Sequence, residues 1–368
     1  MKLKQFLFLT LLLSILLSCK EKQIKNKVEI PAYKPRVIKN VSLQKFDYKK
    51  FGLQTMASIR AIDIVGKNAY FVGNKGMIYA FYPNGNFVIT PNNFFGNISP
   101  NFRAVSHANK KLFALSIESP ARLYQIDLDD KKGLLNPKLV YTEQGEKVFY
   151  DAIAFFDAKN GIAMGDPTDT CLSILKTNDG GNSWVKLSCD ILPDTVDGEA
   201  GFAASNTNIA IVGDNAWIIS GGMQSRVFHT ADKGETWQVY TTPLLYGTES
   251  SGGYSIAFSD AKNGIICGGD YVNKEQNIKN KAITTDEGKT WHLVADGELP
   301  GYISCVQYVP ETQGKEVFAV STEGIYFSNT KGKSWVKVSD EGYYTIKFVT
   351  KNLAWLAGKS KIAKMVLQ

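Results

Sequence analysis

The 368-residue chain is poor in several residue types that build reactive centres. It holds three histidines, six methionines, five cysteines and only five arginines. So few histidines argue against a multi-histidine metal centre, and no glycine fingerprint for a dinucleotide is present. We therefore expect neither a metal nor a cofactor. Hydrophobic residues make up 44% and charged residues 21%, which excludes a disordered or collagen-like chain.

Positive charge is in excess, but its distribution is not typical of a nucleic-acid-binding surface. The formal net charge is +7, and removal of a leader that contains Lys2 and Lys4 would lower it by two. The excess consists of dispersed lysines, without the basic stripe and interleaved aromatic residues that nucleic-acid binding requires. We therefore expect a solubilising surface and no nucleic-acid partner.

Long apolar runs are missing except at the start of the chain. Phe6–Leu17 is almost entirely apolar, follows Lys2 and Lys4, and is too short for a comfortable transmembrane helix. This pattern predicts a signal peptide over residues 1–18. The run ends in Leu-Leu-Ser followed by Cys19, which resembles a bacterial lipoprotein box and implies that Cys19 carries a lipid. The alternative is an ordinary signal peptide with a chance cysteine.

The stretch after Cys19 is polar and rich in lysine up to Arg36, and it cannot bury enough apolar surface to fold alone. We interpret residues 19–36 as a tether for a single domain that spans residues 37–368 and is monomeric. The expected location is a membrane, reached through the Cys19 lipid, in the periplasm or at the cell surface.

Four further cysteines lie within the predicted domain. Cys171 and Cys189 are symmetric about Gly180 at the centre of a proposed hairpin turn, so a disulfide between them is feasible in an exported protein. Cys267 and Cys305 could face each other across neighbouring sheets, and their state is left open. None of the histidines offers an evident base for a catalytic thiol.

A repeated turn motif sets the fold. Four segments share the pattern Ser/Thr-x-Asp-x-Gly-x-Ser/Thr-Trp, with a threonine, Thr330, in place of the acid in the last copy. The segments are Thr177–Trp184, Thr230–Trp237, Thr284–Trp291 and Ser328–Trp335. Successive tryptophans are 53, 54 and 44 residues apart, the spacing of a repeated supersecondary unit.

The motif suits a tight turn between antiparallel strands. The aspartates can accept hydrogen bonds from backbone amides of their own turn, and each tryptophan then starts the next strand and buries its ring. The aspartates are Asp179, Asp232 and Asp286, and the tryptophans are Trp184, Trp237 and Trp291. This is the Asp-box, or bacterial neuraminidase repeat, and we expect these aspartates to be structural rather than catalytic.

A second periodic element, a turn followed by an apolar strand and a glycine, precedes the boxes. Asp157–Gly165 and Asp260–Gly268 are close copies, while Asn206–Gly213 and Lys351–Gly358 are looser ones. Each unit then has four strands, A to D, in 40–50 residues, which is the size of a propeller blade. The predicted blades span residues 56–97, 102–146, 149–190, 200–244, 253–297 and 302–338.

The C-terminal 343–368 supplies only three strands for a further blade. Val37–Phe46 can add the missing outer strand, which would join the two ends of the domain and leave no open sheet edge. We therefore predict an all-β, seven-bladed β-propeller. A six-bladed ring is the alternative, since the first two blades lack Asp-boxes.

Propeller topology places the arginines. Strand A lines the channel, the D–A and B–C connections open on one face, and the Asp-boxes lie on the other. Arg60 and Arg103 start strand A of the first two blades, while Arg122 and Arg226 follow strand B of the second and fourth. We expect all four at one channel mouth, since arginine suits bidentate recognition of carboxylate or phosphate.

Acidic and polar residues are predicted at the same mouth. Asp151 occupies the strand-A position of Arg60 and Arg103, and the other residues lie in B–C or D–A loops. The candidate ligand-binding residues are Arg60, Arg103, Arg122, Asp151, Asp166, Glu199, Arg226, Asp270 and Tyr271. The alternative is that these charges pair with one another and hold the blades in register.

The chain resembles Asp-box propellers of the Ycf48/HCF136-like group of photosystem II stability and assembly factors, in particular Bacteroidetes lipoproteins labelled "oxidoreductase" or "glycosyl hydrolase". The resemblance runs from about Ser58 to the C-terminus and rests on the boxes and on Ser58–Ile62, Phe149–Ile153, Gly161–Pro167, Gly198–Ser205 and Gly268–Tyr271. It implies a binding scaffold whose arginine patch receives a partner, here an unknown exported protein or an anionic glycan.

An enzyme is the rival hypothesis. Sialidases resemble the chain in repeat and fold, which would make it a glycoside hydrolase or another polysaccharide-active enzyme. The catalytic candidates would then be Glu199, Tyr254 and Asp166, with Tyr254 or Tyr271 paired with Glu199 as the nucleophile and Asp166 as the acid. No Arg-Ile-Pro motif precedes the propeller, and the order of the arginines fits poorly. We therefore favour a binding or assembly scaffold that is not an enzyme.

Overall fold

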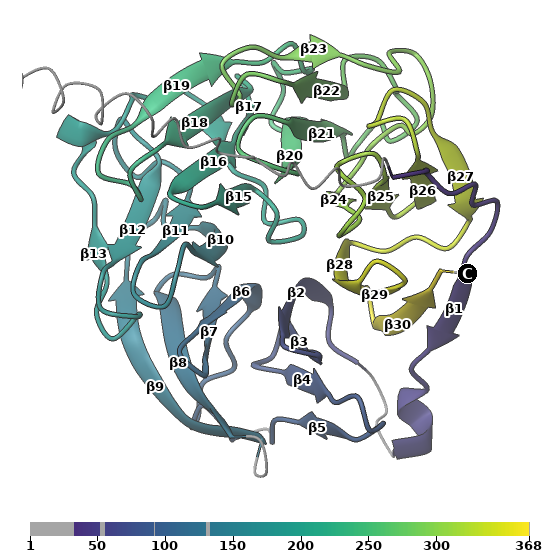
Figure 1. Ribbon diagram of the computed structural model, residues 1–368. Coiled ribbons are helices and arrows are strands. Elements are labelled where there is room, and N and C mark those ends of the chain that lie inside the picture. The colour runs from purple at the N-terminus through teal and green to yellow at the C-terminus, as the bar shows by residue number, and fades with distance from the viewer. Residues whose placement is uncertain (1–32, 52–55, 92, 130–132, 368) are drawn as a thin grey trace, which may run out of the picture. The chain divides into compact units, whose positions relative to one another are not determined.

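Seven antiparallel sheets stand around a central channel in the computed structural model, which describes residues 33–51, 56–91, 93–129 and 133–367. The ring is visible in Figure 1, where the first blades are purple and blue and the last is yellow. The predicted signal peptide, Cys19 and the tether as far as residue 32 lie outside the described residues. The unit from Pro35 to Gln368 is a seven-bladed β-propeller, as predicted, and the six-bladed alternative is excluded.

Each blade has its strand A at the channel and its strand D at the rim. The first three blades, from the channel outwards, are β2 (Ile59–Val65), β3 (Asn68–Gly73), β4 (Ile78–Phe81) and β5 (Phe87–Ile89); β6 (Phe102–Ala108), β7 (Lys111–Ser116), β8 (Ala121–Asp129) and β9 (Gly133–Glu143); and β10 (Tyr150–Phe155), β11 (Gly161–Gly165), β12 (Ser173–Thr177) and β13 (Val185–Lys186). Two short 3₁₀ helices, η1 (Tyr48–Phe51) and η2 (Cys189–Ile191), lie in connections.

The remaining blades follow the same plan. They are β15 (Ile209–Val212), β16 (Asn215–Ile219), β18 (Arg226–Thr230) and β19 (Gln238–Thr241); β20 (Ser251–Phe258), β21 (Gly264–Asp270), β22 (Lys281–Thr284) and β23 (His292–Leu293); β24 (Cys305–Tyr308), β25 (Val317–Ser321), β26 (Gly324–Ser328) and β27 (Val336–Ser339); and β28 (Thr345–Thr350), β29 (Leu353–Gly358), β30 (Lys361–Val366) and β1 (Ser42–Lys45). Apolar side chains fill the space between neighbouring blades, as between the first and second.

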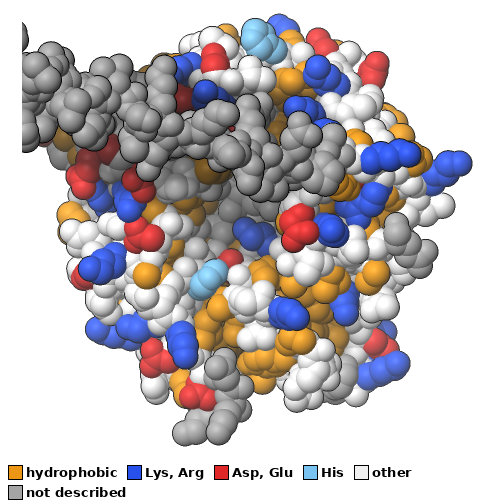
Figure 2. All heavy atoms as spheres, viewed as in Figure 1, with side chains coloured by type: hydrophobic (Ala, Val, Ile, Leu, Met, Phe, Trp, Pro, Cys, Tyr) orange, Lys and Arg blue, Asp and Glu red, His pale blue; other side chains and the backbone are white. Residues whose placement is uncertain are grey.

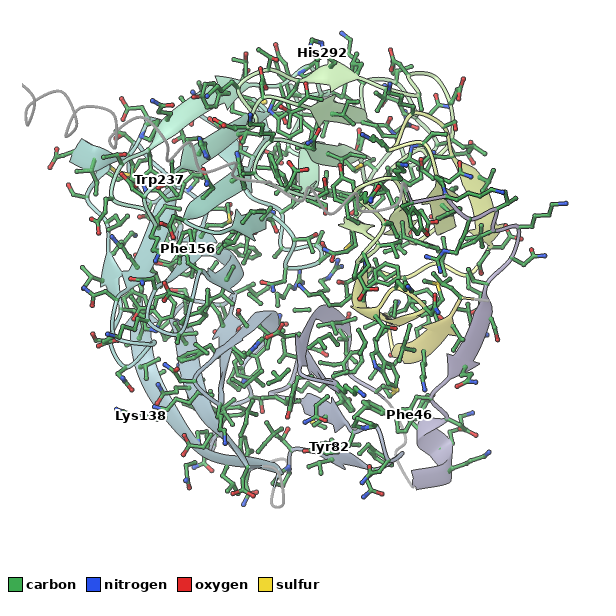
Figure 3. All side chains as sticks on the ribbon, in the orientation of Figure 1. Phe46, Tyr82, Lys138, Phe156, Trp237 and His292 are labelled. Carbon is green, nitrogen blue, oxygen red and sulfur yellow. A yellow bond between two sulfur atoms is a disulfide. The ribbon has the colours of Figure 1, made fainter. Side chains whose placement is uncertain are left out.

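The two ends of the domain close the ring. β1 pairs antiparallel with β30 and supplies the outer strand of the seventh blade, which confirms the predicted closure by residues 37–46. Phe46, which follows β1, packs edge-on against Phe81 and Phe87 of the first blade, and Figure 3 shows it beside that blade. Because the closing strand comes from the start of the chain, both terminal segments of the domain stabilise one sheet.

Arg36, the last residue of the predicted tether, forms an ion pair with the propeller. Its guanidinium lies 2.5 Å from Glu316 Oε2, and its backbone amide donates to Glu316 Oε1 at 2.7 Å. The Glu316 side chain is fully buried, so this pair fixes the start of the domain against the sixth blade. The compact unit of the structure accordingly begins at Pro35, two residues before the predicted boundary at residue 37.

The fourth blade departs from the predicted pattern. Asn206–Gly213 was grouped with Asp157–Gly165, which contains strand B of its blade, but the apolar part of Asn206–Gly213 is β15, a strand A. The chain before it forms an insertion in which β14 (Glu199–Ala200) pairs with β17 (Gly221–Gly222), and β17 continues into the sheet of β20. Gly198–Gly201 was expected to be a loop. The prediction was wrong because this insertion has no counterpart in the other blades.

The repeated turns have the predicted hydrogen bonds. Asp232 Oδ1 accepts from the backbone amides of Glu235 and Thr236, and its other oxygen accepts from the Thr236 hydroxyl at 2.6 Å. The turns at Asp179 and Asp286 repeat this arrangement, and the three following tryptophans are buried. In the last copy the Thr330 hydroxyl accepts from the Ser334 amide at 2.9 Å, so a hydroxyl replaces the carboxylate.

Cys171 and Cys189 form a disulfide, as the symmetry about Gly180 suggested. Replacing both by alanine should lower the free energy of unfolding by about 3 kcal/mol, since a loop of this length then loses its closure constraint. Urea denaturation of the purified domain measures this loss. Reducing agent should destabilise the wild type and leave the double variant unchanged, and equal stability of the two proteins would contradict the prediction. Cys267 and Cys305 are both buried and free.

Candidate functional site at the channel mouth

Local irregularities at the start of strand A aim side chains at one mouth of the channel. Arg60, Arg103, Asp151 and Tyr254 each stand in a register shift between strands A and B of their blades. A bulge of this kind leaves one residue unpaired and redirects its side chain. The equivalence that the sequence suggested for Arg60, Arg103 and Asp151 therefore has a structural basis, and Tyr254 belongs to the same set.

A pocket of about 540 Å³ opens at this mouth. Arg60 and Arg103 line it together with Asp166, Tyr254 and Tyr271. Sequence reasoning missed several further lining residues, namely Phe149, Glu249, Lys274, Tyr302, Thr322 and Tyr344. Of these, the aromatic residues carry no distinctive sequence signal, because aromatic residues are as frequent in the cores between the blades.

Among the described residues, Arg60 and Arg103 differ from the other three arginines in having no carboxylate within ion-pair distance. Arg36 pairs with Glu316 and Arg226 with Glu199, both at 2.5 Å, and Arg122 lies 3.9 Å from Glu118. Within the described ranges, Arg60 and Arg103 form no ion pair, and each donates only a long hydrogen bond of 3.4 Å to a backbone carbonyl, of Ala204 and Ala203 respectively. Both guanidiniums are thus available to an anionic ligand.

The electrostatics of the pocket favour such a ligand. Burial, reinforced by the nearby positive charge of Arg60 and opposed by the Asp151 carboxyl, lowers the pKa of Arg103 to about 10. The Arg60 guanidinium stacks over the Tyr344 ring, 4.0 Å from its centroid, which holds its plane in place. Two like charges in a partly buried pocket repel each other, and an anion that binds both would relieve that repulsion.

The inserted segment before β15 crosses the channel. We call Phe202–Thr207 the channel segment. Besides the two arginine contacts, it makes polar contacts with strand-A regions of the four remaining blades outside its own: Asn206 accepts from the Ile153 amide, Thr207 binds Ser255, the Ser205 hydroxyl donates to Ser304 O, and Thr345 donates to Ser205 O. Contact with all six other blades places the segment at the centre of the ring.

The channel segment separates two pockets. Ala203 and Ala204 line the pocket of Arg60 and Arg103, whereas a second pocket is lined by Ile209–Ile211, the first residues of β15 and beyond the segment. The two pockets share no lining residue. The arginine mouth is therefore a blind pocket whose floor is the backbone of the channel segment.

Two carboxyl groups lie behind the arginines. Asp151 is fully buried, and neither of its oxygens has a hydrogen-bond partner in the described part of the chain. Burial and the neighbouring Asp166 raise the pKa of Asp151 well above its usual value. Burial also raises the pKa of Asp166 to about 6, although the Gly201 amide donates to its Oδ1 at 2.8 Å. Asp166 lines the pocket, whereas Asp151, although it was a candidate ligand-binding residue, does not.

Asp166→Asn should stabilise the domain at neutral pH. A carboxyl whose folded pKa is raised binds its proton more tightly when folded, so stability falls as pH rises from about 4 through about 6. Asparagine keeps an oxygen for the Gly201 amide and removes this loss, a gain of about 1–3 kcal/mol at pH 8. Urea denaturation at pH 4 and pH 8 should show the gain at pH 8 and little difference at pH 4. A gain independent of pH would contradict the assignment.

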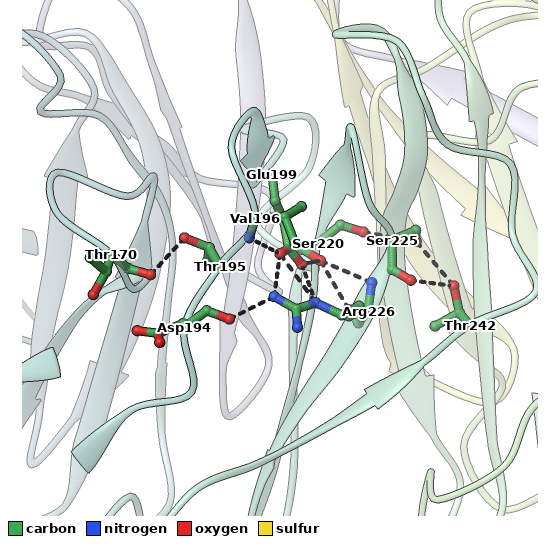
Figure 4. A network of polar contacts seen from close by, with 9 residues as sticks. All are labelled: Thr170, Asp194, Thr195, Val196, Glu199, Ser220, Ser225, Arg226 and Thr242. Carbon is green, nitrogen blue, oxygen red and sulfur yellow. Dashed lines mark hydrogen bonds and ion pairs between the residues drawn. The ribbon is translucent and has the colours of Figure 1, made fainter. Parts of the chain in front are cut away.

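Arg226 and Glu199 form a separate, buried network beside the pocket (Figure 4). Arg226 Nε and Nη2 bind the Glu199 carboxylate, Nη2 also donates to Asp194 O at 2.7 Å, and the Ser220 hydroxyl donates to Glu199 Oε1. The Glu199 side chain is fully buried and that of Arg226 is 14% exposed. For Arg226 and Glu199, the alternative prediction is therefore the correct one: the two charges pair with each other and stabilise the fold.

Several predicted site residues lie outside the pocket. Arg122 and Arg226 are on the expected face but begin β8 and β18, so they stand two strands out from the channel wall. Asp270, the last residue of β21, accepts a hydrogen bond from the Val272 amide and does not line the pocket. The expectation that four arginines converge was wrong for Arg122 and Arg226. The topology argument predicted the face of the propeller on which each arginine lies, but not its distance from the propeller axis.

The pair proposed for a sialidase-like nucleophile is not assembled. The Tyr254 hydroxyl donates to Ser250 O at 2.6 Å, and its ring stacks on Phe202. Burial raises the pKa of Tyr254 far above its usual value. Glu199 is held by Arg226 and Ser220, and no hydrogen bond joins it to Tyr254 in the residues that the structure describes.

Figure 2 shows one face of the ring. On that face, lysine and arginine side chains are spread around the ring, as the dispersed lysines of the sequence suggested. Across the described ranges, no group of three or more histidine, cysteine, aspartate or glutamate side chains is placed to hold a metal ion. No helix in those ranges is long and apolar enough to cross a bilayer.

One family model matches the chain. It describes the photosynthesis system II assembly factor YCF48 and covers residues 139–251, a range that includes the channel segment and the Glu199–Arg226 network. No curated protein sequence matches. The chain is thus similar to YCF48 over less than a third of its length.

Solved structures extend the likeness to the whole fold. "YCF48 bound to D1 peptide" is 12% identical, with a TM-score of 0.61 over 92% of this chain and 98% of that one. YCF48 from Cyanidioschyzon merolae is 16% identical, with a TM-score of 0.60 over 89% and 99%. The WD40 repeats of RRP9 are 12% identical and reach 0.61 over 91% and 100%. At these identities the likeness shows the propeller fold alone.

Proposed function

We propose that this protein is an exported, lipid-anchored binding scaffold that holds a segment of a partner protein at the Arg60–Arg103 mouth and recognises an anionic group on it. The observation that carries the proposal is the contrast among the five arginines. Three are engaged by glutamates, whereas the two that line the pocket have no such partner among the residues that the structure describes. Guanidiniums in this state favour a carboxylate or phosphate ligand.

The comparisons support a binding role over catalysis. The YCF48 propeller to which this chain is similar was solved with a bound peptide, that of D1. We propose the same general activity here, with a different, exported protein as partner. A non-enzymatic role also agrees with the separation of Tyr254 and Glu199, each of which is bound to other groups.

Site-specific photo-crosslinking tests the proposal. A benzophenone amino acid in place of Tyr271, which is 48% exposed and lines the pocket, should capture a discrete protein partner in cells. The same probe at Tyr246, also 48% exposed but outside the pocket, serves as the matched control. Capture at Tyr246 alone, or cleavage of a glycoside panel without any protein adduct, would overturn the proposal.

The anchoring part of the proposal has its own prediction. Cys19→Ser should move the protein from the membrane fraction to the soluble fraction and abolish incorporation of a labelled fatty acid, because no thiol then accepts the lipid. Fractionation followed by immunoblotting measures the shift. Persistence of the variant in the membrane fraction with label still attached would contradict anchoring through Cys19.

A further inference from the structure

A second pocket, of about 570 Å³, opens at the opposite mouth of the channel. Three neighbouring A strands, β28, β2 and β6, contribute charged or titratable side chains to its wall. These are Lys347, Asp63 and His107, in that order. The channel segment separates this pocket from the arginine mouth, so a ligand here contacts none of the residues of the proposed scaffold function.

Asp63 and His107 form a fixed pair in this pocket. His107 Nδ1 lies 2.6 Å from Asp63 Oδ2, and the other Asp63 oxygen accepts from the Ile64 amide at 2.9 Å. Asp63 is only 8% exposed, so it cannot turn away from the imidazole. Because Nδ1 is bound to Asp63, only Nε2 is left to bind a ligand. Within the described ranges, Nε2 has no hydrogen-bond partner. The His107 side chain is 38% exposed.

Lys347 is the other available donor. It is partly buried and forms no ion pair or hydrogen bond with the rest of the described chain. The pocket's remaining charged group is Asp157, whose carboxylate is engaged by Lys233 at 2.8 Å and by the Asn160 side chain. The other polar side chains in the wall, those of Ser106, Asn109, Gln307 and Tyr308, are neutral.

We propose that this pocket is a second binding site, for a small oxyanion of the phosphate or carboxylate class. His107 donates to the anion through Nε2–H while Asp63 holds Nδ1–H, and the Lys347 ammonium supplies the second positive charge. The imidazole and the ammonium come from different blades, so the fold brings together two donors that are far apart in the sequence.

Binding at this site depends on pH. The hydrogen bond with Asp63 raises the pKa of His107, opposed by burial and by the positive charge of Lys347. Below that raised pKa the imidazolium carries a charge and donates through both nitrogens, and above it the charge is lost. The affinity for an anion should therefore fall as the pH rises through the raised pKa of His107.

Imidazole NMR provides the test, because the protein has only three histidines. Sulfate is the phosphate-like probe, since it keeps its charge between pH 6 and 8, and acetate is the carboxylate probe. With ionic strength held constant, we expect a saturable shift of the His107 resonances at pH values below the raised pKa of His107, and weaker binding at pH values above it. Whichever anion saturates at lower concentration identifies the ligand class. The His107→Gln variant assigns the signals.

Matched variants make the proposal falsifiable. Lys347→Met should weaken binding at least about fivefold, whereas Lys364→Met, which removes a similarly half-buried lysine of the same blade outside the pocket, should not. Arg60→Ala with Arg103→Ala should leave the His107 titration unchanged. Absence of a saturable His107 shift with either anion, or equal effects of the two lysine variants, would overturn the proposal without bearing on the scaffold function.

Discussion

Glu199→Ala should lower the free energy of unfolding by about 3–5 kcal/mol, because it leaves the Arg226 guanidinium buried without its counter-charge. The Glu199 side chain is fully buried and receives hydrogen bonds from Arg226, Ser220 and the Val196 amide. Chemical denaturation gives the loss directly.

The control for this loss is an ion pair of the same length at the surface. Lys176 and Glu235 are also 2.5 Å apart, but the Glu235 side chain is 73% exposed. Glu235→Ala should therefore cost less than about 1 kcal/mol. Similar losses in the two variants would show that burial does not decide the contribution of these pairs. A Glu199→Leu, Arg226→Met double variant, which leaves no buried charge, should regain much of the stability.

The network also holds the channel segment. Glu199 precedes Phe202–Thr207 in the insertion, and Arg226 ties the insertion to β18 through Asp194 O. In Glu199→Ala, hydrogen exchange should therefore rise at Ala203–Ser205 more than in the outer strands of the same blade. An equal rise in exchange across the whole blade would indicate global destabilisation and would contradict this local role.

Arg60→Ala with Arg103→Ala should weaken partner binding by at least about 100-fold. Each arginine can give a charge-assisted hydrogen bond of about 1.5–3 kcal/mol to an anionic group, and tenfold in affinity corresponds to about 1.4 kcal/mol. Titration of the partner captured through Tyr271 measures the loss. The double variant should remain folded, because neither arginine is ion-paired within the described ranges and their mutual repulsion is removed.

Arg122→Ala is the matched control for this prediction. Arg122 lies on the same face, at the start of β8, but outside the pocket. Its loss should change the affinity by no more than about threefold, the size of a peripheral electrostatic effect. If Arg122→Ala and the double variant weaken binding equally, the pocket has no special role and only the net charge of the face matters.

The fold could be predicted because each blade repeats local signals. The turn with Asp232 and Trp237, and its copies, fix where strands C and D meet. The second periodic element, a turn followed by an apolar strand and a glycine, then gives the blade count. The closing strand was also predictable, since a three-stranded tail requires a fourth strand. The interpretation of Asn206–Gly213 was wrong, because an apolar run before a glycine has the same sequence pattern in strand A as in strand B.

The site was only half predictable from sequence. Position along a blade gives the face on which a side chain lies, and this placed Arg60 and Arg103 correctly. Distance from the axis depends on which strand carries the residue, so Arg226 at the start of β18 was misplaced. The pairing of Arg226 with Glu199 and the path of the channel segment depend on contacts between residues distant in sequence, for which the single chain carries no local signal.

Arginine footprinting of the complex tests the central claim most directly. Phenylglyoxal modifies accessible guanidiniums, and mass spectrometry reports each of the arginines separately. We predict that the bound partner protects Arg60 and Arg103, while Arg122 reacts at the same rate with and without the partner. Unchanged reactivity of Arg60 and Arg103 in a saturated complex would contradict recognition at this mouth of the propeller.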